Sequence, residues 1–287
     1  MARLLPSIIS LCFHYVIVTT VFISIPRLTH SSTLEADTQI LRALKHSIDP
    51  SSISPISYLN SWDFSVDPCE GSLAQFQPLS LDSENLTYLS LSNNEFAGPI
   101  PDLTGLWQLH TLDLSSNQFH GNLPNLPMRL RSLLLNHNIL SGHISPVTRL
   151  THLRKLDVSD NRLSETIDFF GEDTRLQVLD AEYNRLHGYL PVNLVTIRNL
   201  TTLNLAHNLF SGTIPREYGD KPGQSWRSLY LDNNFLSGNL PPKFISRRAR
   251  LTGSLANNCL RCPTNIPLCR GGQRPGSECV GQNSGSR

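Results

Sequence analysis

A frame of leucine and asparagine recurs about every 24 residues, in seven copies between Asn85 and Pro242. Each copy has two apolar residues two positions apart, and an asparagine follows three positions after the second. The pairs are Leu89/Leu91, Leu112/Leu114, Leu133/Leu135, Leu156/Val158, Leu179/Ala181, Leu203/Leu205 and Leu229/Leu231. In a strand such a pair shares one face, because successive side chains point to opposite sides. One copy buries too little apolar surface to fold alone, so the frame predicts a solenoid of stacked copies with a common core.

The asparagine of each copy lies where the chain turns away from its strand. Its amide can satisfy backbone groups of adjacent turns that would otherwise be buried without partners. Five copies continue with a glycine and then an Ile-Pro or Leu-Pro pair, beginning at Gly98, Gly121, Gly188, Gly212 and Gly238. Glycine suits a tight turn, and the Ile or Leu re-enters the core. We therefore expect parallel strands on one concave face and irregular or helical-turn segments on the back.

The first 32 residues have the composition of a targeting segment. Arg3 precedes a mostly apolar stretch from Leu4 to Ile25, and polar residues follow. This order is typical of a secretory signal peptide. An uncleaved signal anchor is the alternative, since about 20 apolar residues can span a bilayer. We expect no further membrane span and a protein that is secreted to the extracellular space or the cell wall.

The regions that flank the repeats are interpreted as caps. Apolar residues recur at helical spacing from Leu34 to Ile48, and the segment through Cys69 is expected to cover the first copy. An eighth, degenerate copy contains Leu255, Asn258 and Leu260. The predicted organisation is a signal peptide over 1–32, a shortened N-terminal cap over 33–84, repeats over 85–250, and a degenerate last repeat with a cysteine-rich cap over 251–287.

Cysteines and glycan acceptors fit an oxidising, secretory route. Four cysteines cluster near the C-terminus and are expected to form two disulfides, with three pairings left open by their spacing. They are Cys259, Cys262, Cys269 and Cys279, and Cys69 then has no partner within the chain. The triplets Asn85-Leu-Thr87 and Asn199-Leu-Thr201 are acceptors for N-linked glycans in that compartment, at matched positions of two copies.

The predicted binding residues flank the strand leucines on the concave face. They are Asp113, Leu134, Asn136, His137, Asp157, Asp160, Asp180, Glu182, Tyr183, Asn204, His207, Tyr230 and Asp232. The set is acidic with a few aromatic residues, which would suit a peptide that carries Lys or Arg. The alternative is a solvated sheet face that binds nothing.

Charge and motifs exclude several other functions. The formal net charge is +1, so no overall field attracts nucleic acid. The sequence contains no nucleophile elbow, phosphate-binding loop or zinc-protease motif, and the repeats account for the spacing of the acidic residues. Cys259-x-x-Cys262 could be a metal or redox pair, but two further cysteines nearby favour a disulfide cap. We therefore expect no enzyme activity, no cofactor and no metal site.

The repeated frame resembles that of the plant extracellular leucine-rich-repeat family, which reads L-x-x-L-x-L-x-x-N-x-L-x-G-x-I-P. The resemblance covers about residues 34–280 and includes Gly98-Pro-Ile-Pro101 and Gly212-Thr-Ile-Pro215. It implies an α/β solenoid, namely a right-handed superhelix with a parallel concave sheet, a helical N-terminal cap and a disulfide-stabilised C-terminal cap. The family's first cap usually holds two cysteines, whereas here Cys69 stands alone until Cys259.

The resemblance also implies recognition at the cell surface. The favoured hypothesis is a secreted or cell-surface protein that binds a peptide or protein ligand and acts through a membrane receptor kinase in signalling or defence. The alternatives are an inhibitor of a microbial cell-wall enzyme, similar to polygalacturonase inhibitors, and a wall-associated scaffold.

Overall fold

The computed structural model describes Ala43 and residues 87–167, 170–171, 173–221, 226–245, 251–263 and 265–279. Ala43 is helical. The predicted signal peptide, the rest of the N-terminal cap, Cys69 and Asn85 lie outside the described residues. The chain divides into two compact units, Met1–Ile139 and Leu140–Arg287.

The first unit contains one row of parallel strands, one strand from each copy. The row runs β1 (Tyr88–Ser90), β3 (Thr111–Asp113), β5 (Ser132–Leu134). The register places Leu89 beside Leu112 and Leu112 beside Leu133, so the first leucine of each predicted pair occupies the same place in every strand. On the other side of each turn, β2 (Ala97–Pro99) pairs in parallel with β4 (Gln118–Gly121).

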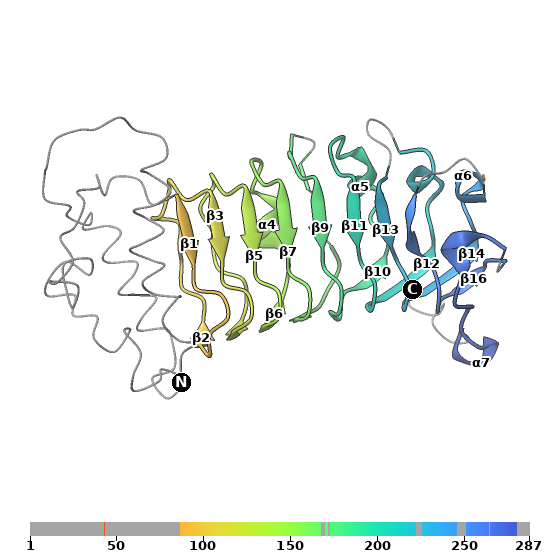
Figure 1. Cartoon of the computed structure of the whole chain (residues 1–287), viewed down its shortest axis with the longest axis horizontal. Helices are drawn as coiled ribbons and strands as arrows, with labels where there is room; N and C mark the ends of the chain where they lie inside the picture. The colour runs from red at the N-terminus through yellow and green to blue at the C-terminus, as the bar shows by residue number, and fades with distance from the viewer. Residues whose placement is uncertain are drawn as a thin grey trace, which may run out of the picture. The chain divides into compact units, whose positions relative to one another are not determined.

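The second unit repeats this plan over more copies (Figure 1). Its main row runs β7 (Lys155–Asp157), β9 (Val178–Asp180), β11 (Thr202–Asn204), β13 (Ser228–Tyr230), β15 (Thr252–Ser254). A second row runs β10 (His187–Tyr189), β12 (Leu209–Thr213), β14 (Phe235–Asn239) and β16 (Cys259–Arg261). Separately, β6 (Ile139–Gly142) pairs in parallel with β8 (Arg162–Leu163). The predicted parallel-sheet solenoid, including the eighth strand, is confirmed.

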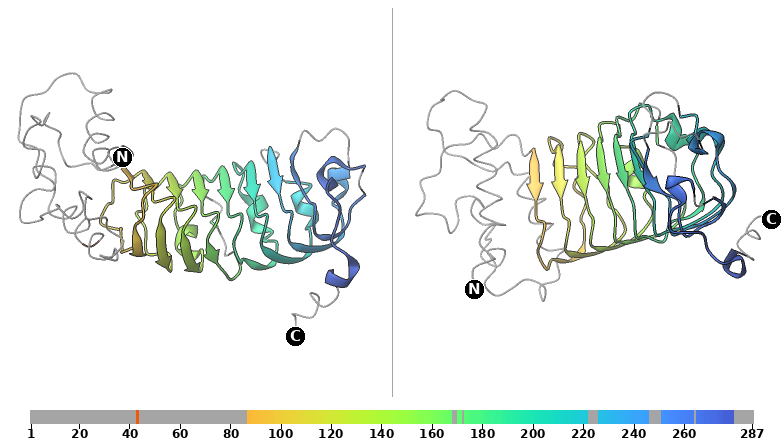
Figure 2. Two further views of the ribbon diagram at one scale, coloured as in Figure 1. Left: turned by 60° about the horizontal axis from the view of Figure 1, so that its bottom comes forward. Right: turned by 45° about the vertical axis from the view of Figure 1, so that its right-hand side comes forward.

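Short helical turns connect the strands of the second unit and follow its last strand, β16, as Figure 2 shows from two further sides. They are α4 (Ser145–Thr148), α5 (Asn193–Thr196), η2 (Arg216–Tyr218), α6 (Pro242–Ile245), η3 (Pro267–Cys269) and α7 (Gly276–Cys279). None of the helices in the described part of the chain has the length and apolar character needed to cross a membrane.

The strand pairs form the core in both units. Every leucine, valine and alanine of the seven predicted pairs is buried. Burial of a Leu side chain stabilises the fold by about 1.5–3 kcal/mol, so the stack supplies what a single copy cannot. The eighth strand departs from this frame, because Gly253 takes the place that Leu229 has in the strand beside it.

Buried asparagines join successive copies, as the sequence predicts. Asn208 is typical: its amide nitrogen donates to the carbonyl oxygen of Ala181 in the preceding copy at 2.9 Å, and its side-chain oxygen accepts the N–H of Leu186 at 2.9 Å. The same amide nitrogen donates to the carbonyls of Leu205 and Ala206 at the end of its own strand. Each asparagine thus replaces backbone partners that the turn removes.

The residue before each of these asparagines has a left-handed backbone. The values of φ lie between 50° and 59° at Asn93, Ser116, His137, Asp160, Tyr183, His207, Asn233 and Asn257. Asparagine, aspartate and histidine tolerate this region better than most residues, whereas a bulky tyrosine rarely adopts it. The turn therefore fixes a regular series of side chains at the exit end of the strands.

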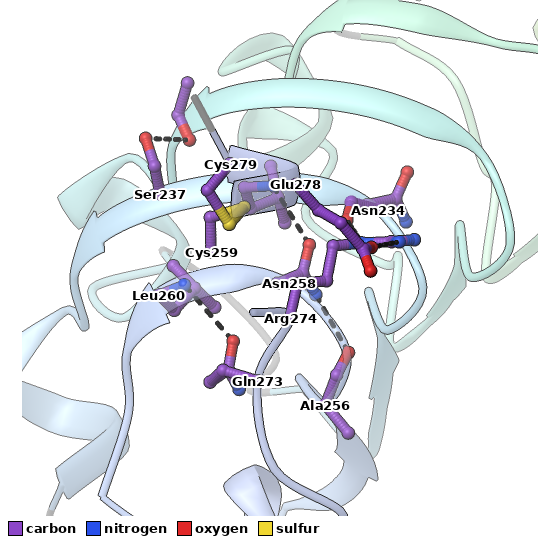
Figure 3. Close-up of a disulfide and its surroundings, with 12 residues drawn as sticks. Asn234, Ser237, Ala256, Asn258, Cys259, Leu260, Gln273, Arg274, Glu278 and Cys279 are labelled. Carbon is purple, nitrogen blue, oxygen red and sulfur yellow. Dashed lines mark hydrogen bonds and ion pairs between the residues drawn. A yellow bond between two sulfur atoms is a disulfide. The ribbon is translucent and has the colours of Figure 1, made fainter. Parts of the chain in front are cut away.

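The C-terminal cap is closed by two disulfides, which settle the open pairing. Cys259 bonds to Cys279, and Cys262 bonds to Cys269. Beside the Cys259–Cys279 disulfide, Gln273 makes the same kind of hydrogen bonds as the repeat asparagines (Figure 3). Its side-chain oxygen accepts the N–H of Leu260 at 3.1 Å, and its amide nitrogen donates to the carbonyl of Leu255 at 3.0 Å. The hydrogen-bond pattern of the repeats thus continues one step past Asn258.

Candidate functional site

The sheet face of the second unit, defined here as the outward side of β7, β9, β11, β13 and β15, carries most of the predicted binding residues. Since the middle residue of each strand points into the core, the residues on either side of it point outward. The third strand position therefore forms a row, in which the register places Asp157 beside Asp180, Asp180 beside Asn204, and Asn204 beside Tyr230.

Three side chains of this face converge on one point. The amide nitrogen of Asn204 donates to the carboxylate of Asp180 at 3.3 Å and to that of Glu182 at 2.8 Å. Two carboxylates thus share one neutral amide, and the carboxylate of Asp157 stands beside Asp180 on the next strand. The only basic residue of the β7 strand, Lys155, lies two positions before Asp157 and is exposed.

The same carboxylates also shape the turns. One oxygen of Asp157 accepts the N–H of Ser159 at 3.3 Å, and one oxygen of Asp180 accepts the N–H of Glu182 at 3.1 Å. Asn204 accepts the N–H of Ala206 in the same way. Such local turns are a common use of Asp and Asn after a strand. These positions therefore have a structural function whether or not the face binds a ligand.

The pKa of Asp180 is raised above its ordinary value. Partial burial is the main cause, because it penalises the charged carboxylate, and the negative charges of Asp157 and Glu182 act in the same direction. The hydrogen bonds from Glu182 and Asn204 oppose the shift without cancelling it. A cation placed at this point would remove the repulsion, so the arrangement favours a positively charged group of a ligand.

Aromatic and polar side chains line the exit end of the strands. The rings of Tyr183 and His207 are stacked with their centroids 3.9 Å apart. The amide nitrogen of Asn233 lies 3.0 Å from Nε2 of His207, which accepts because an amide nitrogen can only donate. The same amide nitrogen reaches the carboxylate of Asp232 at 2.8 Å, and Asn257 donates to Asn233. Tyr183 remains 52 % exposed.

The predicted binding residues divide between the two units. Asp113, Leu134, Asn136 and His137 belong to the first unit, and the remaining nine belong to the second. The contacts described above join Asp180, Glu182 and Asn204 in one group. A separate group holds Tyr183, His207 and Asp232, together with Asn233 and Asn257, which the sequence reasoning missed. Both missed residues directly precede a repeat asparagine, and this position would have identified them.

Two further kinds of site concern metal ions and attached glycans. Within the described ranges, no group of three or more His, Cys, Asp or Glu side chains could hold a metal ion. Asn199 is exposed in the turn before β11. Its modification stays a prediction, and the matched Asn85 falls outside the described ranges.

Comparison with known proteins agrees with this architecture. Models of the Leucine Rich Repeat match residues 85–106, 108–128, 199–220 and 225–246, and a further Leucine Rich repeat model matches 149–165. Receptor-like protein 35 of Arabidopsis thaliana is 34 % identical over 190 residues, which are 56 % of this chain and 20 % of that protein. Receptor-like protein 18 of the same plant is 34 % identical over 149 residues, which are 50 % of this chain and 18 % of that protein.

A solved structure gives a similar result. The Arabidopsis receptor kinase HAESA, in complex with the peptide hormone IDA and the co-receptor SERK1, superposes with a TM-score of 0.63 at 31 % identity. The match covers 79 % of this chain and 38 % of that one. The chain spans about a fifth of the length of the curated receptor-like proteins that it matches.

The repeated strands, the buried asparagines and the matching repeat models define a leucine-rich-repeat solenoid. The chain is similar in sequence to plant receptor-like proteins and in fold to the ectodomain of a plant receptor kinase.

Proposed function

We propose that this chain is a non-enzymatic recognition module at the outside of the cell. In this proposal the sheet face of the second unit binds a basic segment of a peptide or protein ligand, and a membrane receptor kinase transmits the signal. The main support for this proposal is that the carboxylates of Asp180 and Glu182 share the amide of Asn204. Asp157 lies beside Asp180 on the neighbouring strand.

The size of the face limits the length of ligand in contact with it. Five strands at a spacing of about 4.8 Å extend over about 20 Å from the first to the last. An extended chain advances about 3.3 Å per residue, so about six residues of a ligand would cross the face. A Lys or Arg within those six residues would meet the carboxylates, while the exposed rings of Tyr183 and Tyr230 would provide apolar contact.

The functions of the relatives support the proposed role in recognition. HAESA was solved with a peptide hormone and a co-receptor, and the curated relatives are receptor-like proteins. Because this chain spans only a small part of those relatives, its own ligand and partner are part of the proposal.

The test removes charge without removing the turns. Replacement of Asp157 and Asp180 by Asn and of Glu182 by Gln keeps an acceptor oxygen at each position, whereas replacement by Lys would also break the turns. The matched control replaces the exposed Glu95, Asp173 and Glu217 in the same way, which changes the net charge equally. The probe is a library of synthetic decapeptides that differ only in their number of Lys and Arg residues, and binding is measured by interferometry.

We expect the library to bind the unmodified chain in proportion to its positive charge. Three ion pairs on a partly solvated face, at about 0.2–1 kcal/mol each, predict that the amide variant binds about tenfold more weakly. The control variant should keep its affinity. Equal affinities of the amide variant, the control variant and the unmodified chain for basic decapeptides would rule out this face as the site. The receptor-kinase partner is tested separately, by co-precipitation of kinase ectodomains with and without bound peptide.

A further inference from the structure

The turn that leads into β11 contains the triplet Asn199-Leu200-Thr201, and its three residues have different surroundings. The side chain of Asn199 is exposed. Leu200 is completely buried in the core, and Thr201 is 8 % exposed. The asparagine therefore points to solvent while the rest of the triplet forms part of the packed interior.

The interior position of Thr201 is fixed by the neighbouring copy. Its N–H donates to the carbonyl oxygen of Gln177 at 3.0 Å, and its hydroxyl lies 3.5 Å from the same oxygen. The N–H of Thr202 donates to that oxygen as well. Attachment of an N-linked glycan requires the asparagine and the Thr hydroxyl of the triplet together. Once β11 has packed beside β9, that hydroxyl is no longer accessible with the asparagine.

The triplet also lies away from the proposed binding residues. Asn199 precedes the first residue of β11 by three positions, whereas His207 follows the last residue by three positions. The two residues are thus at opposite ends of the same strand. The residue one copy earlier, Arg175, is exposed as well, so the entry end of β11 has room for a bulky polar group.

We propose that Asn199 carries an N-linked glycan that is attached while this copy is still unfolded. The folded chain then holds the glycan at the entry end of β11, and the sheet face and the exit end stay uncovered. This proposal does not depend on the identity of the ligand or on whether the sheet face binds one.

The first experiment measures occupancy in the full chain. The sequence contains two Asn-x-Ser/Thr triplets, so Asn85→Gln leaves Asn199 as the single acceptor. This variant is expressed in plant cells, recovered from the culture medium and analysed by intact mass before and after enzymatic glycan removal. We expect the mass of one glycan, its loss in Asn199→Gln and in Thr201→Val, and its retention in Thr201→Ser. A secreted chain without a glycan at Asn199 would overturn the proposal.

The second experiment addresses the order of events. Folded, unmodified full-length chain from bacteria is incubated with purified oligosaccharyltransferase, and a synthetic peptide of residues 193–206 shows that the enzyme is active. We expect transfer to the peptide and at least a tenfold lower yield on the folded chain. Equal yields would contradict attachment before folding, while the mass measurement would still decide whether Asn199 is a glycan site.

Discussion

The ring of Tyr183 stacks on the imidazole of His207, with the two planes inclined by 16°. Both residues have left-handed backbones, with φ of 51° and 52°. Each precedes the buried asparagine of its own copy, so the register of the solenoid brings the two rings together. The stack is a contact between successive copies that lies outside the core.

A double-mutant cycle measures this contact. Replacement of Tyr183 and His207 by Ala, singly and together, should give a coupling of about 0.5–1.5 kcal/mol in the free energy of unfolding, as for other aromatic pairs. Urea denaturation followed by circular dichroism provides the four values. The control pair is His207 and Tyr189, which belongs to β10. The losses in the free energy of unfolding caused by His207→Ala and Tyr189→Ala should add within about 0.5 kcal/mol. Additivity for Tyr183 and His207 as well would contradict the stacked arrangement.

The buried asparagines of the turns should contribute strongly to the free energy of unfolding. Asn208→Ala removes the acceptor of the Leu186 N–H and the donor to three carbonyls. Because these backbone groups stay buried, we expect a loss of at least about 2 kcal/mol in the free energy of unfolding. The exposed Asn239 provides the control, since its replacement by Ala should change stability by less than about 0.5 kcal/mol. Similar losses for the two variants would refute the structural role of Asn208.

Gly253 should be intolerant of any side chain. A Cβ at this position would lie 1.8 Å from the carbonyl oxygen of Leu229, and φ is 151°. Gly272 also has a positive φ of 83°, but a Cβ there meets nothing within 4 Å. We expect Gly272→Ala to cost about 1–2 kcal/mol from the backbone alone, and Gly253→Ala to cost about 1–3 kcal/mol more because of the collision. Thermal or urea unfolding of both variants checks this, and equal costs would count against the close approach of β13 and β15.

The raised pKa of Asp180 predicts a pH dependence with a definite sign. The folded state favours the protonated carboxyl, so ionisation of Asp180 lowers stability fully above its folded pKa and not at all below its unfolded value near 3.8. Asp180→Asn should therefore gain stability relative to the unmodified chain at pH 7, and this gain should vanish as the pH falls toward 3.5.

Asp220 supplies a control of opposite sign. A hydrogen bond with Lys243, at 2.6 Å, lowers the pKa of the Asp220 carboxyl. Asp220→Asn should therefore lose rather than gain stability at pH 7, and the difference should disappear as the pH falls through the lowered folded pKa. Urea titrations of both variants from pH 7 to about pH 2 measure the two trends. A pH-independent difference for Asp180→Asn would show that burial and its acidic neighbours do not act on this carboxyl.

Sequence was sufficient for the repeat architecture because each copy repeats the same physical requirement. The leucine pairs, the turn asparagines and glycines such as Gly212 recur at fixed offsets, and the structure places them in the strands, the buried turns and the positive-φ positions that the offsets predict. Glu165 stands where other copies have the turn glycine and keeps a positive φ of 74°. This backbone conformation could not be predicted, because a non-glycine residue rarely adopts that region.

Contacts between copies were harder to predict than the copies themselves. The sequence placed Asp180, Glu182 and Asn204 on one face, but their convergence on a single amide depends on rotamers and on the register of β9 and β11. The pairing of Cys259 with Cys279 likewise depends on the path of the chain through η3 and α7. Gln273 gave no signal in the repeat frame, because it belongs to no copy.

Gln273 has a consequence for the behaviour of the molecule in solution. With Leu260 and Leu255 already bonded to its amide, and with the N–H of Leu255 bonded to the carbonyl of Leu268 at 2.7 Å, the turn after β15 has partners from the same chain. These donors and acceptors are therefore not available to a neighbouring molecule, so this turn does not contribute to the end-to-end strand pairing that open edges promote.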